Sequence, residues 1–200
     1  MTFIKMCGLR DEATVDLAVG LGVDAVGFVL ARSPRQVTPE LTARLRAHVP
    51  DGTLAVGVYV GIGLDEIVET ARVAGLDTVQ VHDLRSAADV TTLHDAGLKV
   101  VRALNTGGAA DLNSDLGEDL LLVDGAVAGA GVTWDWQDRS ALPDRRWVLA
   151  GGLTPANVAR AVASSGAWGV DVSSGIESSR GVKDPALMAA FATAVRAPQP

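Results

Sequence analysis

A lone cysteine and a distant aspartate are the residues of this chain best suited to proton-transfer chemistry. Cys7 is the only cysteine among 200 residues and follows the apolar segment FIKM, whereas Asp124 follows the apolar segment LLLV. A thiol and a carboxyl group that face each other across a pocket can act as base and acid. Each also has a simpler interpretation, because a free cysteine often behaves as a small buried hydrophobic residue and an aspartate can cap a turn.

Two glycine-containing segments in the last third of the chain could hold an anion. One is GGL after the apolar segment WVLA, and the other is SSG after GVDV. Glycine lets the backbone approach a ligand closely, and serine adds hydroxyl donors. Turn formation would explain either segment alone, but the two together predict a phosphate site. The candidate substrate-binding residues here are Gly151, Gly152, Asp171, Ser173, Ser174 and Gly175.

Other polar side chains also follow apolar segments. Arg35, in the segment ARSPRQ, could pair a substrate carboxylate through its planar guanidinium group, although an isolated loop arginine is often a surface residue. Gln80 and His82 follow another apolar segment, and Arg102 follows a further one. We interpret His82 as a structural hydrogen-bonding residue near the site rather than as a catalyst.

Eight short apolar segments have to position these residues. They begin at Phe3, Ala25, Leu54, Thr78, Lys99, Leu120, Trp147 and Gly169. Most are continuously apolar, which is typical of parallel strands buried on both faces. Helix signals lie between them, including Thr38 and Thr154 as N-terminal caps before prolines and Gly75 at a C-terminus. Residues 105–118 and 134–143 have room for only a turn or two of helix.

This alternation, at about 25 residues per unit, predicts a compact (β/α)8 TIM barrel. We expect residues 1–200 to form this single domain, with weak helices after the fifth and sixth strands. The alternative is an open doubly wound sheet, but the glycine cluster at Gly129 precedes no long helix and is a weak dinucleotide signal. In a barrel the active site forms at the carboxyl ends of the strands, with phosphate at the last two. Cys7 and Asp124 would then lie on roughly opposite sides of one mouth.

Composition narrows the possible partners. The chain has 17 basic and 24 acidic residues, a net charge of −7, which argues against a nucleic-acid partner. No apolar stretch approaches the ~18 residues of a membrane helix, and the N-terminus lacks a signal-peptide layout. A single cysteine excludes an internal disulfide, and three scattered histidines argue against zinc. We expect a cytoplasmic monomer.

Several motifs together resemble one enzyme family. IKMCGL, DAVGFV with SPRQVTPE, VGVYV, TVQVH, AGGLTPANV and GVDVSSGIESSRGVKD occur in order between residue 4 and about residue 191. In this order they are similar to phosphoribosylanthranilate isomerase of tryptophan biosynthesis. The resemblance implies an Amadori rearrangement of N-(5'-phosphoribosyl)anthranilate to 1-(2-carboxyphenylamino)-1-deoxyribulose 5-phosphate, without metal or cofactor.

The resemblance also implies roles for individual residues. Asp124 would be the general acid that protonates the furanose ring oxygen, and Cys7 the general base that takes the C2 proton, once the pKa of its thiol is lowered. Arg35 would hold the anthranilate carboxylate. The backbone at Gly152 and at residues 173–175 would hold the phosphate.

The chain departs from the family pattern after the sixth strand. The segment DGAVAGAGVTWDW is about three residues shorter than usual and has Val132 where the family has lysine. We assign no role to Trp134 and Trp136 in that segment. Asp83 and Gly61 replace a customary glycine and asparagine. Because this loop normally covers the substrate, the resemblance implies an isomerase with a modified lid.

Two alternatives remain. A histidine-pathway aminoaldose isomerase performs the same rearrangement on a similar barrel, but it normally has an aspartate where this chain has Cys7. A barrel that binds a phosphosugar without turnover would fit the altered loop. The presence of Cys7, Asp124 and Arg35 together argues against that second alternative.

Overall fold

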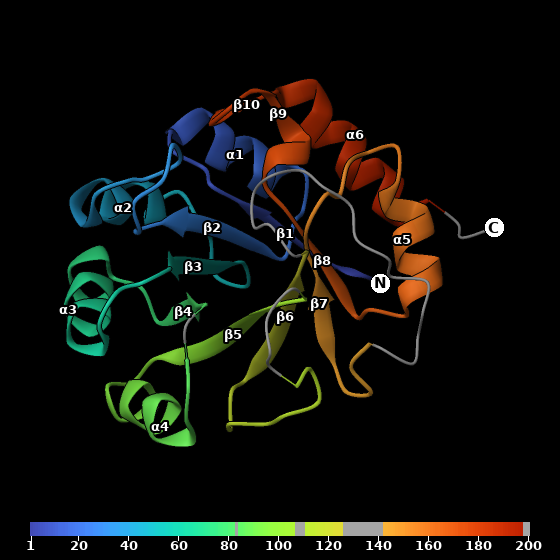
Figure 1. The fold of residues 1–200 in the computed structure, drawn as a ribbon. Helices are drawn as coiled ribbons and strands as arrows, with labels where there is room; N and C mark the ends of the chain where they lie inside the picture. Colours follow the sequence, from blue (N-terminus) through green and yellow to red (C-terminus); the bar gives the residue numbers. More distant parts are fainter. Residues whose placement is uncertain (83, 107–110, 126–141, 198–200) are drawn as a thin grey trace.

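The chain folds into a closed barrel of eight parallel strands in a computed structural model that describes residues 1–82, 84–106, 111–125 and 142–197. The strands follow one another around the barrel in chain order, and the last pairs with the first (Figure 1). They are β1 (Phe3–Cys7), β2 (Ala25–Val29), β3 (Leu54–Tyr59), β4 (Thr78–Val81), β5 (Lys99–Asn105), β6 (Leu120–Asp124), β7 (Trp147–Leu149) and β8 (Gly169–Val172). All eight predicted segments are strands, and the predicted (β/α)8 barrel is confirmed.

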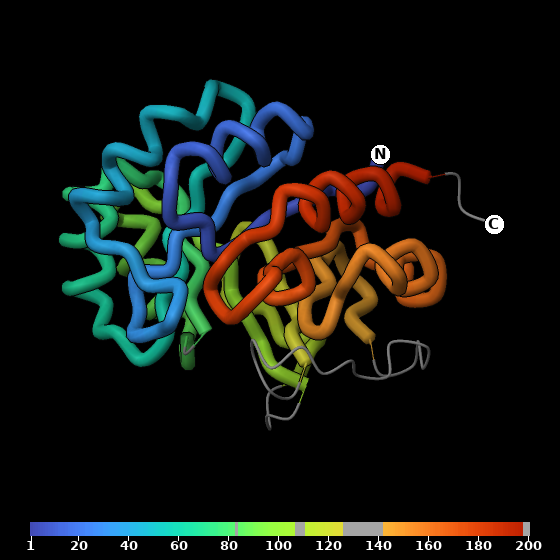
Figure 2. The backbone as a smooth tube through the Cα atoms, turned by 90° about the horizontal axis from the view of Figure 1, so that it is seen from above, coloured from blue at the N-terminus to red at the C-terminus, as the bar shows by residue number. Residues whose placement is uncertain are grey.

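Helices cover the outside of the barrel, as the two views in Figures 1 and 2 show. They are α1 (Glu12–Gly20), α2 (Pro39–Arg46), α3 (Leu64–Ala74), α4 (Ala87–Asp95), α5 (Val158–Ser165) and α6 (Pro185–Arg196). Their buried faces, with Leu45, Ile67 and Leu93 among them, join the outward side chains of the strands in one large apolar cluster. Between β8 and α6 lie a short 3-10 helix, η2 (Ser174–Ile176), and a hairpin of β9 (Glu177–Ser179) and β10 (Val182–Lys183). None of the helices in these described ranges is long and apolar enough to cross a membrane.

The predicted helix ends are confirmed at two positions and wrong at a third. The Thr38 hydroxyl caps α2 by accepting the Leu41 N–H at 3.2 Å, and Gly75 ends α3 in the left-handed region. α5, however, begins at Val158 and not after Thr154. Asn157 explains the delay, because its Oδ1 accepts the Thr154 N–H at 2.8 Å and its Nδ2 donates to the Gly152 carbonyl at 2.9 Å. These bonds hold the preceding residues in a turn that is tied to Gly152.

The segment between β5 and β6 forms turns where it is described, at residues 111–118. It is held by Glu118, whose side chain is completely buried. Arg102 on β5 donates to Glu118 at 2.9 Å, Arg145 pairs with the same carboxylate, and the Leu116 N–H donates to its other oxygen at 2.8 Å. This cluster replaces helix packing on that side of the barrel. Most of the other segment with weak helix signals, including Trp134 and Trp136, lies outside the described residues, as do Gly129, Val132 and Asp83.

The barrel interior is apolar at one end and polar at the other. Phe3 stacks on Trp168 at the N-terminal end, with ring centroids 4.6 Å apart. Above them lies an apolar cluster of Val101, Ala103, Leu122, Val148 and Ala150. Ionisable side chains, starting with Lys5 on β1 and Asp171 on β8, lie nearer the carboxyl ends of the strands. The side chains able to transfer protons therefore lie toward the carboxyl ends of the strands.

Candidate active site

A cavity of about 290 Å³ lies at the carboxyl ends of the strands and is lined by both Cys7 and Asp124. We call it the main cavity. A smaller hollow adjoins it, because Asp124, Asp171 and Ser173 line both spaces. This second space, the glycine hollow, is also lined by Gly151, Gly152 and Ser174. The structure thus brings the predicted acid–base pair and most of the predicted anion-binding residues together.

Asp124 is the last residue of β6, and its environment favours the protonated carboxyl group. Its Oδ1 is buried and has no hydrogen-bond partner among the described residues. Burial, followed by the neighbouring Asp171 carboxylate, raises the pKa of Asp124 to about 6. Gly151 leaves room for this arrangement: its φ is +89°, and a Cβ there would lie 2.6 Å from Oδ1 of Asp124. A carboxyl group with such a pKa can donate a proton near neutral pH.

Cys7 is the last residue of β1, and its environment favours the uncharged thiol. Burial raises the pKa of Cys7 above its ordinary value of 9.0, although the Lys5 and Lys183 cations act in the opposite direction. The protein surroundings alone therefore do not lower the pKa of the thiol as a thiolate base requires. A cationic group on a bound ligand would supply it, because an opposite charge within a few ångströms favours the thiolate.

A buried ion pair that the sequence analysis missed acts on the pKa values of both Cys7 and Asp124. Lys5 Nζ lies 2.9 Å from Asp171 Oδ1, and both side chains are more than 90% buried. Burial lowers the pKa of Lys5, but Asp171 and Cys7 raise it above its ordinary value. The available signal was spacing: Lys5 lies two residues before Cys7, so both point to the same face of β1.

Arg35 lines the main cavity, but one edge of its guanidinium is already occupied. Nε and Nη2 donate to the two carboxylate oxygens of Glu177 at 2.6 and 2.9 Å. Arginine has five N–H donors, so the edge formed by Nη1 and Nη2 still has donors for a substrate carboxylate. Glu177 therefore fixes the direction in which Arg35 points.

Glu177 also connects Arg35 to the glycine hollow. Lys183 Nζ lies 2.9 Å from Glu177 Oε1 and donates to the Ser173 carbonyl at 2.8 Å. Burial would raise the pKa of Glu177, but hydrogen bonds from Arg35, the Gly181 N–H and Lys183 lower it to about 2. Sequence analysis assigned no role to Glu177 or Lys183, which lie in the hairpin after β8 and become neighbours only through its fold.

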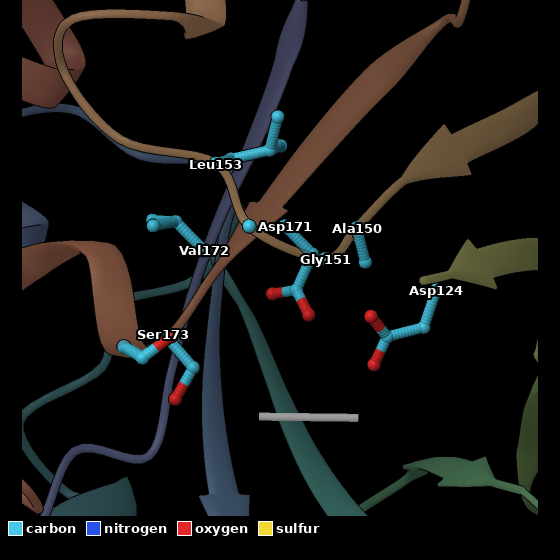
Figure 3. A pocket seen from close by; sticks show the side chains of 9 residues that line it. Asp124, Ala150, Gly151, Leu153, Asp171, Val172 and Ser173 are labelled. Carbon is cyan, nitrogen blue, oxygen red and sulfur yellow. The ribbon is translucent and has the colours of Figure 1, made fainter. Parts of the chain in front are cut away.

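The glycine hollow lies where the loops after β7 and β8 meet. Figure 3 shows the carboxyl groups of Asp124 and Asp171 directed toward the same space, which Ser173 also lines. Gly175 packs closely against Leu153, which lines the hollow, because a Cβ on Gly175 would come within 1.8 Å of the Leu153 carbonyl oxygen. Of the predicted anion-binding residues, Gly175 lines neither described cavity, and its contact with phosphate stays a prediction.

Comparisons with known proteins show the family to which the chain belongs. The family model described as N-(5'phosphoribosyl)anthranilate (PRA) isomerase matches residues 4–194. The N-(5'-phosphoribosyl)anthranilate isomerase of Beijerinckia indica is 42% identical over 212 residues, which cover 98% of this chain and 95% of the relative. The chain belongs to the N-(5'-phosphoribosyl)anthranilate isomerase family. The resemblance inferred from the motifs is confirmed.

Solved structures of this isomerase family have the same fold. TrpF from Jonesia denitrificans is 42% identical, with a TM-score of 0.88 over 98% of this chain and 97% of its own. A phosphoribosyl anthranilate isomerase in complex with reduced 1-(o-carboxyphenylamino)-1-deoxyribulose 5-phosphate is 28% identical, with a TM-score of 0.82 over 98% and 99% of the two chains.

The remaining candidate residues divide between the site and the scaffold of this isomerase-family barrel. Gln80 and His82 line the main cavity, whereas Arg102 pairs with Glu118 and lines neither space. Gly61, where the family prefers asparagine, has a φ of +66°, a conformation that asparagine also tolerates. Within the described ranges, no cluster of three or more histidine, cysteine or acidic side chains could hold a metal ion.

Proposed function

We propose that the chain catalyses the Amadori rearrangement of N-(5'-phosphoribosyl)anthranilate to 1-(2-carboxyphenylamino)-1-deoxyribulose 5-phosphate. The observation that carries this proposal is the position of Cys7 and Asp124 in one cavity, with the pKa of Asp124 raised to about 6. Membership of the isomerase family supports it. So does the relative that binds the reduced product.

Asp124 acts first, as the general acid. Its protonated carboxyl group gives a proton to the furanose ring oxygen as the bond between that oxygen and C1 breaks. The anilinic nitrogen supplies its lone pair to C1, so that an open-chain iminium forms. The pKa of Asp124, about 6, keeps a useful fraction of the carboxyl group protonated near neutral pH.

Cys7 acts second, as the general base. The positive iminium acidifies the C2 hydrogen and also favours the thiolate of Cys7 over the buried neutral thiol. The thiolate takes the C2 proton, the electrons of the C–H bond form a C1=C2 double bond, and the C=N electrons return to nitrogen. The resulting enolamine becomes the ketone when its C2 hydroxyl proton is lost and C1 gains a proton.

Binding groups at both ends orient the sugar between these two residues. The donors that Arg35 does not give to Glu177 hold the anthranilate carboxylate. The backbone at Gly152 and at residues 173–175 holds the phosphate, together with the serine hydroxyl groups. Lys183 supports this end because it is bonded to the Ser173 carbonyl.

The test is turnover of N-(5'-phosphoribosyl)anthranilate by the purified protein, with growth rescue of a tryptophan auxotroph that lacks the isomerase. We expect product formation and rescue. Turnover of the histidine-pathway aminoaldose alone would favour that alternative activity instead. Binding of the reduced product without turnover of either substrate would identify a phosphosugar-binding barrel and contradict the proposal.

We also propose that the protein is a cytoplasmic monomer without a nucleic-acid partner. Among the described residues the large exposed apolar side chains are few, namely Met1, Val60, Val73 and Val182, and the net charge of −7 disfavours polyanions. Cys7 is a free thiol, and its proposed role needs it reduced, as cytosol keeps it. Sedimentation at several protein concentrations tests the monomer, and a mass twice that of one chain would contradict it.

A further inference from the structure

An unpaired amide oxygen in the main cavity has no role in the mechanism above. Three buried side-chain polar atoms lack a hydrogen-bond partner within the described residues, and two of them, Asp124 Oδ1 and Gln80 Oε1, belong to residues that line this cavity. The oxygen of Asp124 belongs to the general acid. We propose that Gln80 Oε1 accepts a hydrogen bond from the anilinic N–H of the substrate and stabilises the iminium; this inference rests on the proposed function.

The surroundings of Gln80 leave its oxygen without a hydrogen-bond partner among the described residues. The side chain extends from β4 and is only 2% exposed. Its Nε2 lies 3.2 Å from Nε2 of His82. Because an amide nitrogen can only donate, the imidazole nitrogen must accept, and Oε1 is left over. Leaving a buried acceptor unsatisfied costs about 1–3 kcal/mol, so such an atom needs an explanation, and a hydrogen bond to substrate is one.

The lining of the cavity indicates which substrate group lies nearest to Gln80. Val58 on β3 pairs with Gln80 in register, and Val29 on β2 pairs with Val58, so an apolar wall adjoins the amide. This wall suits the aromatic ring, whose carboxylate is assigned to Arg35. The phosphate lies at the glycine hollow, beside β7 and β8. The anilinic nitrogen joins the aromatic ring to the sugar, so it must lie between the apolar wall and the glycine hollow. Its N–H is the hydrogen-bond donor at this junction.

The contact would be stronger in the intermediate than in the substrate. The anilinic nitrogen is neutral in the substrate and carries positive charge in the iminium. A hydrogen bond from a charged donor is roughly twice as strong as a neutral one. An interaction that strengthens along the reaction raises kcat more than it lowers KM. Gln80 is therefore assigned to stabilising the developing charge, and not only to binding.

The experiment compares kcat and KM of Gln80→Met, which has a similar shape but no acceptor, with those of Gln80→Glu, which keeps one. We expect Gln80→Met to lower kcat by between about tenfold and a hundredfold, the range for a hydrogen bond to a charged group, with KM nearly unchanged. Gln80→Glu should retain clearly more of kcat. Thr78→Val is the matched control, because Thr78 is buried on the same strand but lines a separate cavity at the other end of the barrel.

Two results would overturn the inference while leaving the proposed function intact. One is wild-type kcat with a raised KM in Gln80→Met, which would mean contact with a group that the reaction does not change. The other is no change in either constant. A crystal structure of the wild-type protein with the reduced product decides the matter without a variant: we expect the anilinic nitrogen within about 3.2 Å of Gln80 Oε1, and a nitrogen beyond hydrogen-bond distance contradicts the contact. An inactive wild type would instead refute the proposed function itself.

Discussion

At Asp124 and Cys7, burial acts on both acid–base groups in the same direction and favours their uncharged forms. The pKa of Asp124 rises to about 6, and that of Cys7 rises above its ordinary value of 9.0. The proposed reaction needs a protonated carboxyl group on Asp124 and a thiolate on Cys7. In the free enzyme this combination is a minority state at every pH. Between the two pKa values the dominant state is the Asp124 carboxylate with the neutral Cys7 thiol. Because both states carry the same number of protons, the fraction of the reactive combination stays constant over that range.

The pH dependence of kcat/KM should show this reversed order of ionisation. We expect kcat/KM to rise up to about pH 6, stay level, and fall only above the pKa of Cys7. A value that falls as pH rises through 6 would contradict this account, since the thiol would then already be ionised. The substrate phosphate also titrates near pH 6. The control is therefore the pH profile of the residual activity of Asp124→Asn. If kcat/KM of this variant still rises up to about pH 6, that rise belongs to the substrate phosphate.

The raised pKa of Asp124 should also cost stability. Below the ordinary aspartate value of 3.8 the carboxyl group is protonated in the folded and unfolded chains, so it has no effect; above about 6 the folded chain must bury a charge. The shift corresponds to up to about 3 kcal/mol. We expect Asp124→Asn to raise the free energy of unfolding at pH 8 and to change it little near pH 4, as measured by urea denaturation. Equal effects at both pH values would contradict the assignment.

At the scale of elements, the β9–β10 hairpin supplies the charges that organise both ends of the site. Glu177 receives hydrogen bonds from Arg35 on one side and Lys183 on the other. This places a carboxylate, itself outside the main cavity lining, between the groups proposed to hold the substrate carboxylate and the phosphate. The hairpin is therefore a positioning element.

Glu177→Gln should weaken substrate binding and stability together. The amide cannot accept from Arg35 on both oxygens, so two buried cations lose their counter-ion, and breaking such a pair costs about 3–5 kcal/mol. We expect a higher KM and a lower free energy of unfolding at pH 7, with the stability difference shrinking as pH falls from 4.5 toward the pKa of Glu177, about 2. Glu69→Gln is the control, because its ion pair with Arg72 is exposed and contributes little to stability. Equal stability losses in the two variants would contradict the role of Glu177.

The sequence predicted elements better than side-chain partners, for physical reasons. All eight strands follow from apolar segments, because burial on both faces leaves a local pattern. The start of α5 was missed because the local side-chain bonds of Asn157 to Thr154 and Gly152 hold a turn that the Thr-Pro start signal does not reveal. Cys7 and Asp124 could be predicted from their positions at strand ends. The partnership of Arg35 with Glu177 could not, because those residues are 142 positions apart.

At the scale of the whole molecule, a buried ion pair bridges the seam where the barrel closes. Lys5 on β1 and Asp171 on β8 are paired in register, and their side chains meet at 2.9 Å within the barrel. The first and last strands are thus joined by backbone hydrogen bonds and by charge. The same pair affects the pKa values of the Cys7 thiol and the Asp124 carboxyl group, so it would serve both the closure of the barrel and the proposed catalysis.

Lys5→Met should therefore destabilise the barrel by leaving Asp171 buried without its cation, a loss of about 3–5 kcal/mol. The double variant Lys5→Met with Asp171→Leu removes both charges, and we expect it to recover part of that loss in urea denaturation. A double variant no more stable than Lys5→Met alone would show that the ion pair does not explain the effect.

The central claim is that Cys7 and Asp124 act as base and acid from opposite sides of one cavity. Its most direct test is kcat for N-(5'-phosphoribosyl)anthranilate in Cys7→Ala and in Asp124→Asn, measured beside the affinity of each variant for the reduced product. The account predicts that kcat falls by about 10² to 10⁴ in each variant, the usual contribution of general acid–base catalysis, while the affinity changes little. Near wild-type kcat in either variant would contradict it.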